Sequence, residues 1–314
     1  MGSEKNNIFA NHKQFEIMEK ALVNDRLNNR FIQNHSKPII MNNDILPIEN
    51  YIFKKAPIKR IGDSGKLLLA INTHNKSEKY IVKHEFIDCA CNEFMYSKLG
   101  QLLGLKFADV KFFNTLTPPL NPLFTTEDVI GIEYLDLEND NVSFDEIKNK
   151  CKNFEDYFKY IAIRKLFYDI DSFEIALDKQ GYIYKLDNSA TFCISNFILQ
   201  YIYINFDREI NGIHINIEKF TKKQFIKQLE YYKSHDYINY ENTLSSIKTK
   251  YGIEYTKYFL EPFYNLANLD LSSMDNIINT LCYFYPDYIG NYYKQYMEIT
   301  QNKVKKFLTL PKLT

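Results

Sequence analysis

The sequence has no tryptophan, no net charge and no long apolar run. Lys and Arg number 39 in a chain of 314 residues, and Asp and Glu also number 39, so the formal net charge is zero. A zero balance argues against a dedicated binder of nucleic acids or anionic membranes, because both draw affinity from excess positive charge. No run of about eighteen apolar residues is present, so we expect no transmembrane helix. The N-terminal residues also lack the apolar core of a signal peptide.

Cysteine and histidine patterns typical of zinc sites and disulfide frameworks are also missing. The cysteines are odd in number and scattered, which favours reduced thiols and a cytoplasmic location: Cys89, Cys91, Cys151, Cys193 and Cys282. No HExxH or Gly-x-Ser-x-Gly motif occurs, so neither a zinc hydrolase nor an α/β-hydrolase is expected. The opening Met1-Gly2-Ser3 resembles a myristoylation signal, but the sixth residue is asparagine rather than serine or threonine. These three residues are either native or an expression remnant.

Aromatic residues are abundant despite the missing tryptophan. The chain has 25 tyrosines and 24 phenylalanines, and its hydrophobic share of 45% is enough for a substantial core. Asn, Ile, Lys and Tyr all have A/T-rich codons, so their abundance indicates genome bias before function. The pairs Tyr231-Tyr232 and Tyr292-Tyr293 are therefore most simply helix-packing residues. An aromatic groove for a partner is the alternative.

The pattern of elements changes along the chain. Helical periodicity over 11–32 leads into an irregular connector over 34–50, and together these define an N-terminal segment, residues 1–50. Residues 51–138 form a small β-rich lobe with one helix, and residues 139–314 form a larger helical lobe. The expected strands of the small lobe are 57–61, 66–71, 80–85, 108–113 and 129–134. Its helix runs over 89–103 and is closed by Gly104. The expected fold is therefore α+β and bilobal.

Two aspartates flank a predicted hairpin in the larger lobe. The apolar runs 175–177 and 182–186 are joined by Asp178-Lys-Gln-Gly181, which is a strong turn signal. Asp169 precedes the first run and Asp187 follows the second, so the hairpin brings both carboxylates to one end. A pair of this kind can supply a proton acceptor and a metal ligand for phosphoryl transfer. Two surface acids are the alternative interpretation.

Motifs upstream of the hairpin give the chain a resemblance to a known family. Tyr80-Ile-Val-Lys83 resembles the third-strand lysine motif of protein-kinase-like folds, and Asn92-Glu93 begins a helix that runs into Gly104-Leu105. This order resembles the HipA-like kinases and, more loosely, the phosphoinositide-kinase-like group. The resemblance implies that Lys83 holds the ATP phosphates and that Glu93 pairs with this lysine. It also implies that the backbone of 131–135, including Glu133 and Leu135, binds adenine.

The resemblance also assigns roles around the hairpin. Asp169 corresponds to the catalytic aspartate, and Asp187 to the metal-binding aspartate. Glu174 stands where the family has a metal-binding asparagine, and its oxygens are still suitable for Mg²⁺. Asp171 replaces a histidine, so three acids lie within six residues and repel each other unless a cation sits among them.

A short glycine loop is the candidate for nucleotide contact. Gly62-Asp-Ser-Gly65 lets backbone N–H groups approach phosphate, and Ser64 is a candidate for self-phosphorylation. The loop is not a Walker motif, and a plain hairpin turn is the alternative.

We therefore expect an ATP- and Mg²⁺-dependent phosphotransferase, of HipA-like kind, acting on a protein serine or threonine. Its expected partners are the nucleotide and a protein substrate or regulator. A pseudokinase or binding module with the same fold, or an unrelated α+β interaction protein, are the alternatives. Both kinase-fold interpretations require Lys83 and Asp187 to lie within reach of one site, and a separation of about 20 Å, far beyond side-chain reach, would exclude them.

Overall fold

The computed structural model describes ten segments of the chain: residues 42–57, 67–85, 87–114, 128–139, 142–170, 173–189, 191–192, 217–234, 240–285 and 287–310. The predicted helix over 11–32, Gly62, Ser64, Gly65, Asp171 and Cys193 lie outside these segments. Within them, no helix has both the length and the apolar character that a membrane crossing requires.

The larger sheet has six strands in the order β1-β5-β6-β4-β3-β2. All neighbours pair antiparallel except β1 and β5. A small aromatic core covers one part of this sheet, where Phe113 makes edge contacts with Tyr51 and Tyr80. The strands are β1 (Ile45–Pro47), β2 (Tyr51–Lys55), β3 (Leu68–Asn72), β4 (Lys79–Glu85), β5 (Val110–Asn114) and β6 (Asp128–Glu133).

One expectation for the start of this sheet was wrong. The connector expected over 34–50 contains strand β1 and the 3-10 turn η1 (Ile48–Asn50). Strand β2 precedes the predicted first strand at 57–61, of which Pro57 lies outside any strand and the rest lies outside the described residues. Strand β1 has only three residues and pairs with a strand more than sixty positions away. Periodicity cannot detect so short a strand, because its partner is remote in sequence.

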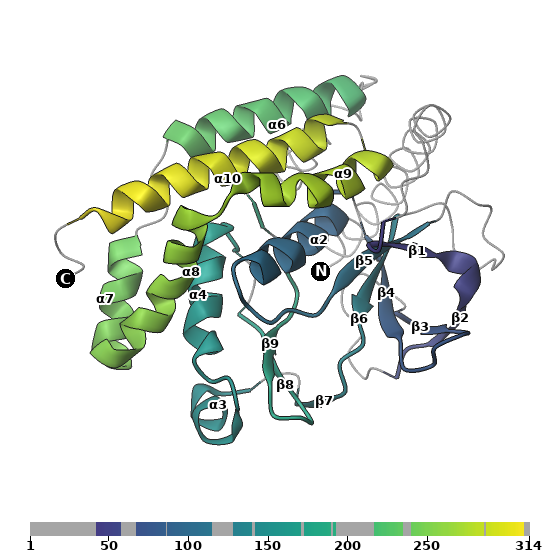
Figure 1. Cartoon of the computed structure of the whole chain (residues 1–314), viewed down its shortest axis with the longest axis horizontal. Coiled ribbons are helices and arrows are strands. Elements are labelled where there is room, and N and C mark those ends of the chain that lie inside the picture. Colours follow the sequence, from purple (N-terminus) through teal and green to yellow (C-terminus); the bar gives the residue numbers. More distant parts are fainter. Residues whose placement is uncertain are drawn as a thin grey trace, which may run out of the picture.

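Helix α2 (Ile87–Leu102) is the central element of the molecule. Every residue from Ala90 to Gly100 is buried. The helix packs on strands β4, β5 and β6 and also contacts α9 (Asp275–Phe284) (Figure 1). Gly104 follows it with φ +85°, as the predicted C-terminal glycine requires. Because residues 90–100 of α2 are all buried, each polar side chain in this stretch needs a partner inside the protein.

A second, three-stranded sheet has the order β7-β8-β9. Its strands are β7 (Leu137–Asn139), β8 (Ile175–Asp178) and β9 (Ile183–Lys185). The predicted hairpin turn is confirmed, since Gly181 donates to the Asp178 carbonyl and has φ +87°. The Asp178 carboxylate also accepts from two backbone N–H groups of the turn. Helices α3 (Phe144–Lys150) and α4 (Asp156–Leu166) lie between β7 and β8 in the sequence.

The C-terminal part of the chain is helical, as predicted. Its long last helix, α10 (Asp287–Leu308), contacts α6, α8 and α9 (Figure 1). The other helices are α6 (Ile217–Ser234), α7 (Tyr240–Lys250) and α8 (Thr256–Asn268), with 3-10 turns η2 (Ile253–Tyr255) and η3 (Leu271–Met274). The fold is thus α+β, with a curled sheet followed by a helical region, and it is compatible with a bilobal kinase-like fold.

Candidate phosphotransfer site

Lys83 and Glu93 form an ion pair between the sheet and the central helix. Lys83 lies near the end of β4, and Glu93 lies on α2. The lysine Nζ is 3.1 Å from Glu93 Oε1. The glutamate side chain is only 2% exposed, against 18% for the lysine. A carboxylate buried to this extent is stable only when it is paired and hydrogen-bonded.

Asp187 brings a second carboxylate to the same lysine. Its Oδ1 atom is 3.9 Å from Lys83 Nζ, and its side chain is 45% exposed. The distance meets the requirement that Lys83 and Asp187 reach one site. Asp187 also has φ +49°, a left-handed conformation that is uncommon for a residue other than glycine. Strained residues of this kind concentrate at functional sites.

Helix α2 also holds the loop that carries Asp187. The Asn92 side-chain amide donates to the carbonyls of Ser189, at 2.7 Å, and Thr191, at 3.1 Å. Asn188 donates to the second oxygen of Glu93 at 3.4 Å. Asn92 was not among the predicted site residues, although the Asn92-Glu93 pair had drawn attention to its position. Its function is to hold the loop beside the ion pair.

Asp169 lies beside this loop, but its carboxylate points into the protein. The side chain has no exposed surface. Its Oδ2 atom is 2.8 Å from Lys185 Nζ, 3.2 Å from the Tyr96 hydroxyl and 3.5 Å from Arg164 Nε. Burial, followed by the nearby Asp169 charge, raises the pKa of Tyr96 well above its ordinary value. Tyr96 therefore stays protonated and donates its hydrogen to Asp169.

Glu174 lies at the same end of the hairpin as Asp187. Its carbonyl accepts from the N–H of Leu186, the residue before Asp187, at 3.0 Å. Both residues carry carboxylate oxygens suited to Mg²⁺, and Asp187 lies 3.9 Å from Lys83, which fits a metal bound by one or two carboxylates together with a nucleotide. Among the described side chains, no three acidic, histidine or cysteine residues converge on one point.

The predicted adenine-binding segment lies at the end of β6. Glu133 is tied to the stretch before β5, because its N–H donates to the Asp109 carbonyl at 2.7 Å and its carboxylate accepts from the Asp109 N–H at 3.1 Å. Its own N–H is therefore engaged within the protein. Leu135 lies just beyond the strand, where its carbonyl accepts from Leu137 N–H at 3.0 Å.

Lys185 is a functional candidate that the sequence did not reveal. It is a single lysine in the apolar strand β9, its side chain is fully buried, and it contacts Asp169 directly. A charged residue inside an apolar run is the signal that could have identified it, because lysine is almost never fully buried unless it is paired.

Three tyrosines of α10 donate hydrogen bonds to α2, to α4 and to the segment after Asp187. The Tyr292 hydroxyl donates to the Phe192 carbonyl at 2.6 Å, and Tyr293 donates to Asn92 Oδ1 at 2.7 Å. Tyr296 donates to the Leu166 carbonyl at 3.1 Å. Tyr292 and Tyr293 are thus packing residues, as expected, but each also fixes a segment that leads to the site.

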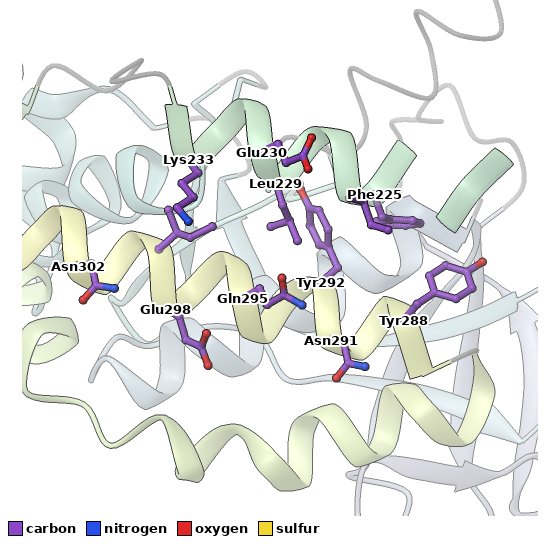
Figure 2. A pocket seen from close by; sticks show the side chains of 12 residues that line it. Phe225, Leu229, Glu230, Lys233, Tyr288, Asn291, Tyr292, Gln295, Glu298 and Asn302 are labelled. Atoms are coloured by element: carbon purple, nitrogen blue, oxygen red, sulfur yellow. The ribbon is translucent and has the colours of Figure 1, made fainter. Parts of the chain in front are cut away.

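A surface groove lies between α6 and α10, and Tyr292 is one of the residues that line it (Figure 2). Its volume is about 580 Å³. Apolar side chains of both helices line it, among them Phe225, Leu229 and Tyr288, and polar groups such as Glu230 and Lys233 complete its wall. None of the predicted site residues lines this groove, so it is separate from the candidate site.

The hydrogen bond from Tyr293 to Asn92 predicts that the Tyr293 hydroxyl stabilises the protein. Tyr293→Phe keeps the ring but leaves the buried Asn92 Oδ1 without this donor. We expect the free energy of unfolding to fall by about 1–3 kcal/mol, measured by urea denaturation. Tyr283→Phe is the matched control, because within the described residues the Tyr283 hydroxyl makes no hydrogen bond. Equal free energies of unfolding for the two variants would contradict this stabilising role of the Tyr293 hydroxyl.

Comparison with known proteins gives limited information. No protein-family model matches the chain, and no curated protein matches it significantly. Among solved structures, the chain is similar to the crystal structure of a Helicobacter pylori proinflammatory kinase, CtkA. The TM-score is 0.44 and the identity 11%, over 85% of this chain and 100% of that chain. Likeness at this level carries no argument about activity, so the functional conclusion rests on the geometry around Lys83.

Proposed function

We propose that the protein transfers the γ-phosphoryl group of Mg·ATP to a hydroxyl group, as a HipA-like kinase acting on protein serine or threonine. The observation that carries this proposal is the position of Lys83 Nζ between two carboxylates of different exposure. Glu93 is buried and 3.1 Å away, whereas Asp187 is half exposed and 3.9 Å away. Phosphoryl transfer depends on positioning and electrostatic stabilisation, and these three residues offer both.

Each residue has a distinct role in this proposal. Lys83 holds the phosphates as a point charge, and the buried Glu93 fixes the direction of its side chain. Asp187 and Glu174 hold Mg²⁺, which neutralises charge on the phosphates when it is bound. We assign Asp169 to holding Lys185 rather than to contact with the attacking hydroxyl, because its side chain has no exposed surface and its Oδ2 atom faces Lys185, Tyr96 and Arg164.

The chemistry balances without a further reactant. The bond between the γ-phosphorus and its bridging oxygen breaks, and a bond forms between this phosphorus and the substrate hydroxyl oxygen. ADP leaves with the electron pair of the broken bond, and the hydroxyl proton passes to water. The transition state in this reaction class is loose, so a strong protein base is not essential.

The proposal predicts that Asp187 is required for turnover but not for folding. Asp187→Asn keeps the shape of a half-exposed side chain and removes the charge that binds the metal. We expect Mg·ATP turnover to fall by at least about 100-fold, since such charge stabilisation is worth several kcal/mol, with an unchanged melting curve. Phosphate release and transfer from labelled ATP measure this loss.

Asp136→Asn is the matched control for this experiment. Asp136 is also an exposed aspartate, 64% exposed, and it pairs with Lys179 at 2.9 Å on the outside of the same hairpin. Its variant should turn over ATP like the wild type. Equal turnover by wild type and Asp187→Asn would show that the site is wrongly assigned.

The second candidate is a binding module that holds the nucleotide without turning it over. The observation that favours it is the complete burial of the Asp169 carboxylate beside Lys185. Thermal shifts distinguish the candidates from a protein without a nucleotide site. Either function predicts that ATP with Mg²⁺ raises the melting temperature of the wild type, because a ligand that binds only the folded state stabilises it. The absence of a shift under every condition would count against both candidates. A shift without turnover would favour the binding module.

A further inference from the structure

Lys185 is a buried ammonium that joins two loops. Its Nζ atom is 2.8 Å from Asp169 Oδ2 on one side. On the other side it donates to the carbonyl of Leu186 at 3.2 Å, the carbonyl of Asp187 at 3.0 Å and Asn188 Oδ1 at 2.9 Å. A charge without exposed surface costs several kcal/mol unless it is paired and hydrogen-bonded, and these four acceptors satisfy that demand.

The backbone carbonyl and the carboxylate of Asp187 have different surroundings. Its backbone carbonyl faces the buried lysine, whereas its carboxylate is half exposed and lies 3.9 Å from Lys83 Nζ. The backbone of Asp187 is left-handed, with φ +49°. Tyr168, directly before Asp169, has φ +50°. Conformations of this kind are unfavourable for residues other than glycine and persist only where the surroundings enforce them.

Other contacts support the same segments, and the Phe192 N–H joins them by donating to the Phe167 carbonyl at 2.6 Å. Asn92 binds the carbonyls of Ser189 and Thr191, beyond Asp187. Tyr96 approaches Asp169 from α2, and Arg164 approaches it from α4. Lys185 contacts both Asp169 and Asp187, so its ammonium sets the spacing between them.

We infer that Lys185 is a positioning residue for phosphoryl transfer: it fixes Asp169 and the backbone of Asp187 around one charge, so that the Asp187 carboxylate points outward to the metal and Lys83. This inference rests on the proposed function. A lysine suits the position because its compact ammonium turns three donors towards converging acceptors, whereas the planar guanidinium of arginine does not.

Lys185→Met tests the inference, because it keeps an apolar chain of similar length and removes the charge. A carboxylate displaced by about 1 Å can cost on the order of 100-fold in rate. We therefore expect kcat to fall by about 10- to 100-fold, and half-maximal activity to require several-fold more Mg²⁺. The KM for ATP should change much less, since Lys83 and Glu93 are untouched. A general loss of structure would not produce this split.

Lys179→Met is the matched control. Lys179 lies in the turn of the same hairpin, is 63% exposed and pairs with Asp136 on the surface. It should keep the wild-type kcat and Mg²⁺ dependence. If Lys179→Met loses as much activity as Lys185→Met, the effect belongs to the hairpin as a whole and the inference is overturned.

A second comparison covers the case in which Lys185→Met does not fold, because it leaves Asp169 buried without its main partner. Asp169→Asn/Lys185→Met removes both charges of the pair, and Asp169→Asn alone is its reference. The readout is the Mg²⁺ concentration that supports ADP binding, which needs no turnover. We expect a several-fold higher Mg²⁺ midpoint in the double variant, and equal midpoints would overturn the inference.

The outcomes separate this inference from the proposed function. If Lys185→Met matches the wild type while Asp187→Asn is inactive, the inference fails and the proposed function stands. If the wild type itself neither binds nor turns over Mg·ATP, the proposed function fails and this inference fails with it.

Discussion

The buried carboxylate of Glu93 is the constraint on which the site depends. Its side chain is 2% exposed within the buried stretch 90–100 of α2, so the protein must supply its partners. Lys83 comes from β4 on one side, and Asn188 comes from the loop after β9 on the other. Satisfying one charge thus brings together a strand, the central helix and the loop of Asp187. The half-exposed Asp187 carboxylate is left as the outward-facing ligand.

Two further layers hold this arrangement in place. Lys185 neutralises Asp169 and binds the backbone of Asp187 from inside. Beyond it, the hydroxyls of α10 bind the segments on either side, and Tyr293 in particular orients Asn92. The helical region therefore contributes directly to the site, although it supplies none of the predicted phosphate or metal ligands. Rigid support of this kind is what a positioning mechanism requires.

Local sequence patterns predicted the elements that are themselves local. The Asp178 turn, the Gly104 helix end and the order of strand, helix and hairpin all follow from short-range signals. The resemblance to HipA-like kinases then named Lys83, Glu93 and Asp187, which lie together in the structure. The missed features depend on long-range contacts. Asn92 and Tyr293 are 201 positions apart, and neither residue alone signals their hydrogen bond. The inward orientation of Asp169 likewise depends on Lys185 and Tyr96, which no motif connects to it.

The central claim is that Lys83 faces the phosphates of a bound nucleotide. An ATP analogue with a reactive acyl phosphate transfers its acyl group to a lysine beside the phosphates, and mass spectrometry identifies the modified residue. The account predicts that Lys83 is acylated, that excess Mg·ATP protects it, and that the exposed Lys179 reacts slowly and without protection. Acylation of Lys83 that Mg·ATP does not reduce, or protection of a different lysine in its place, would contradict the account.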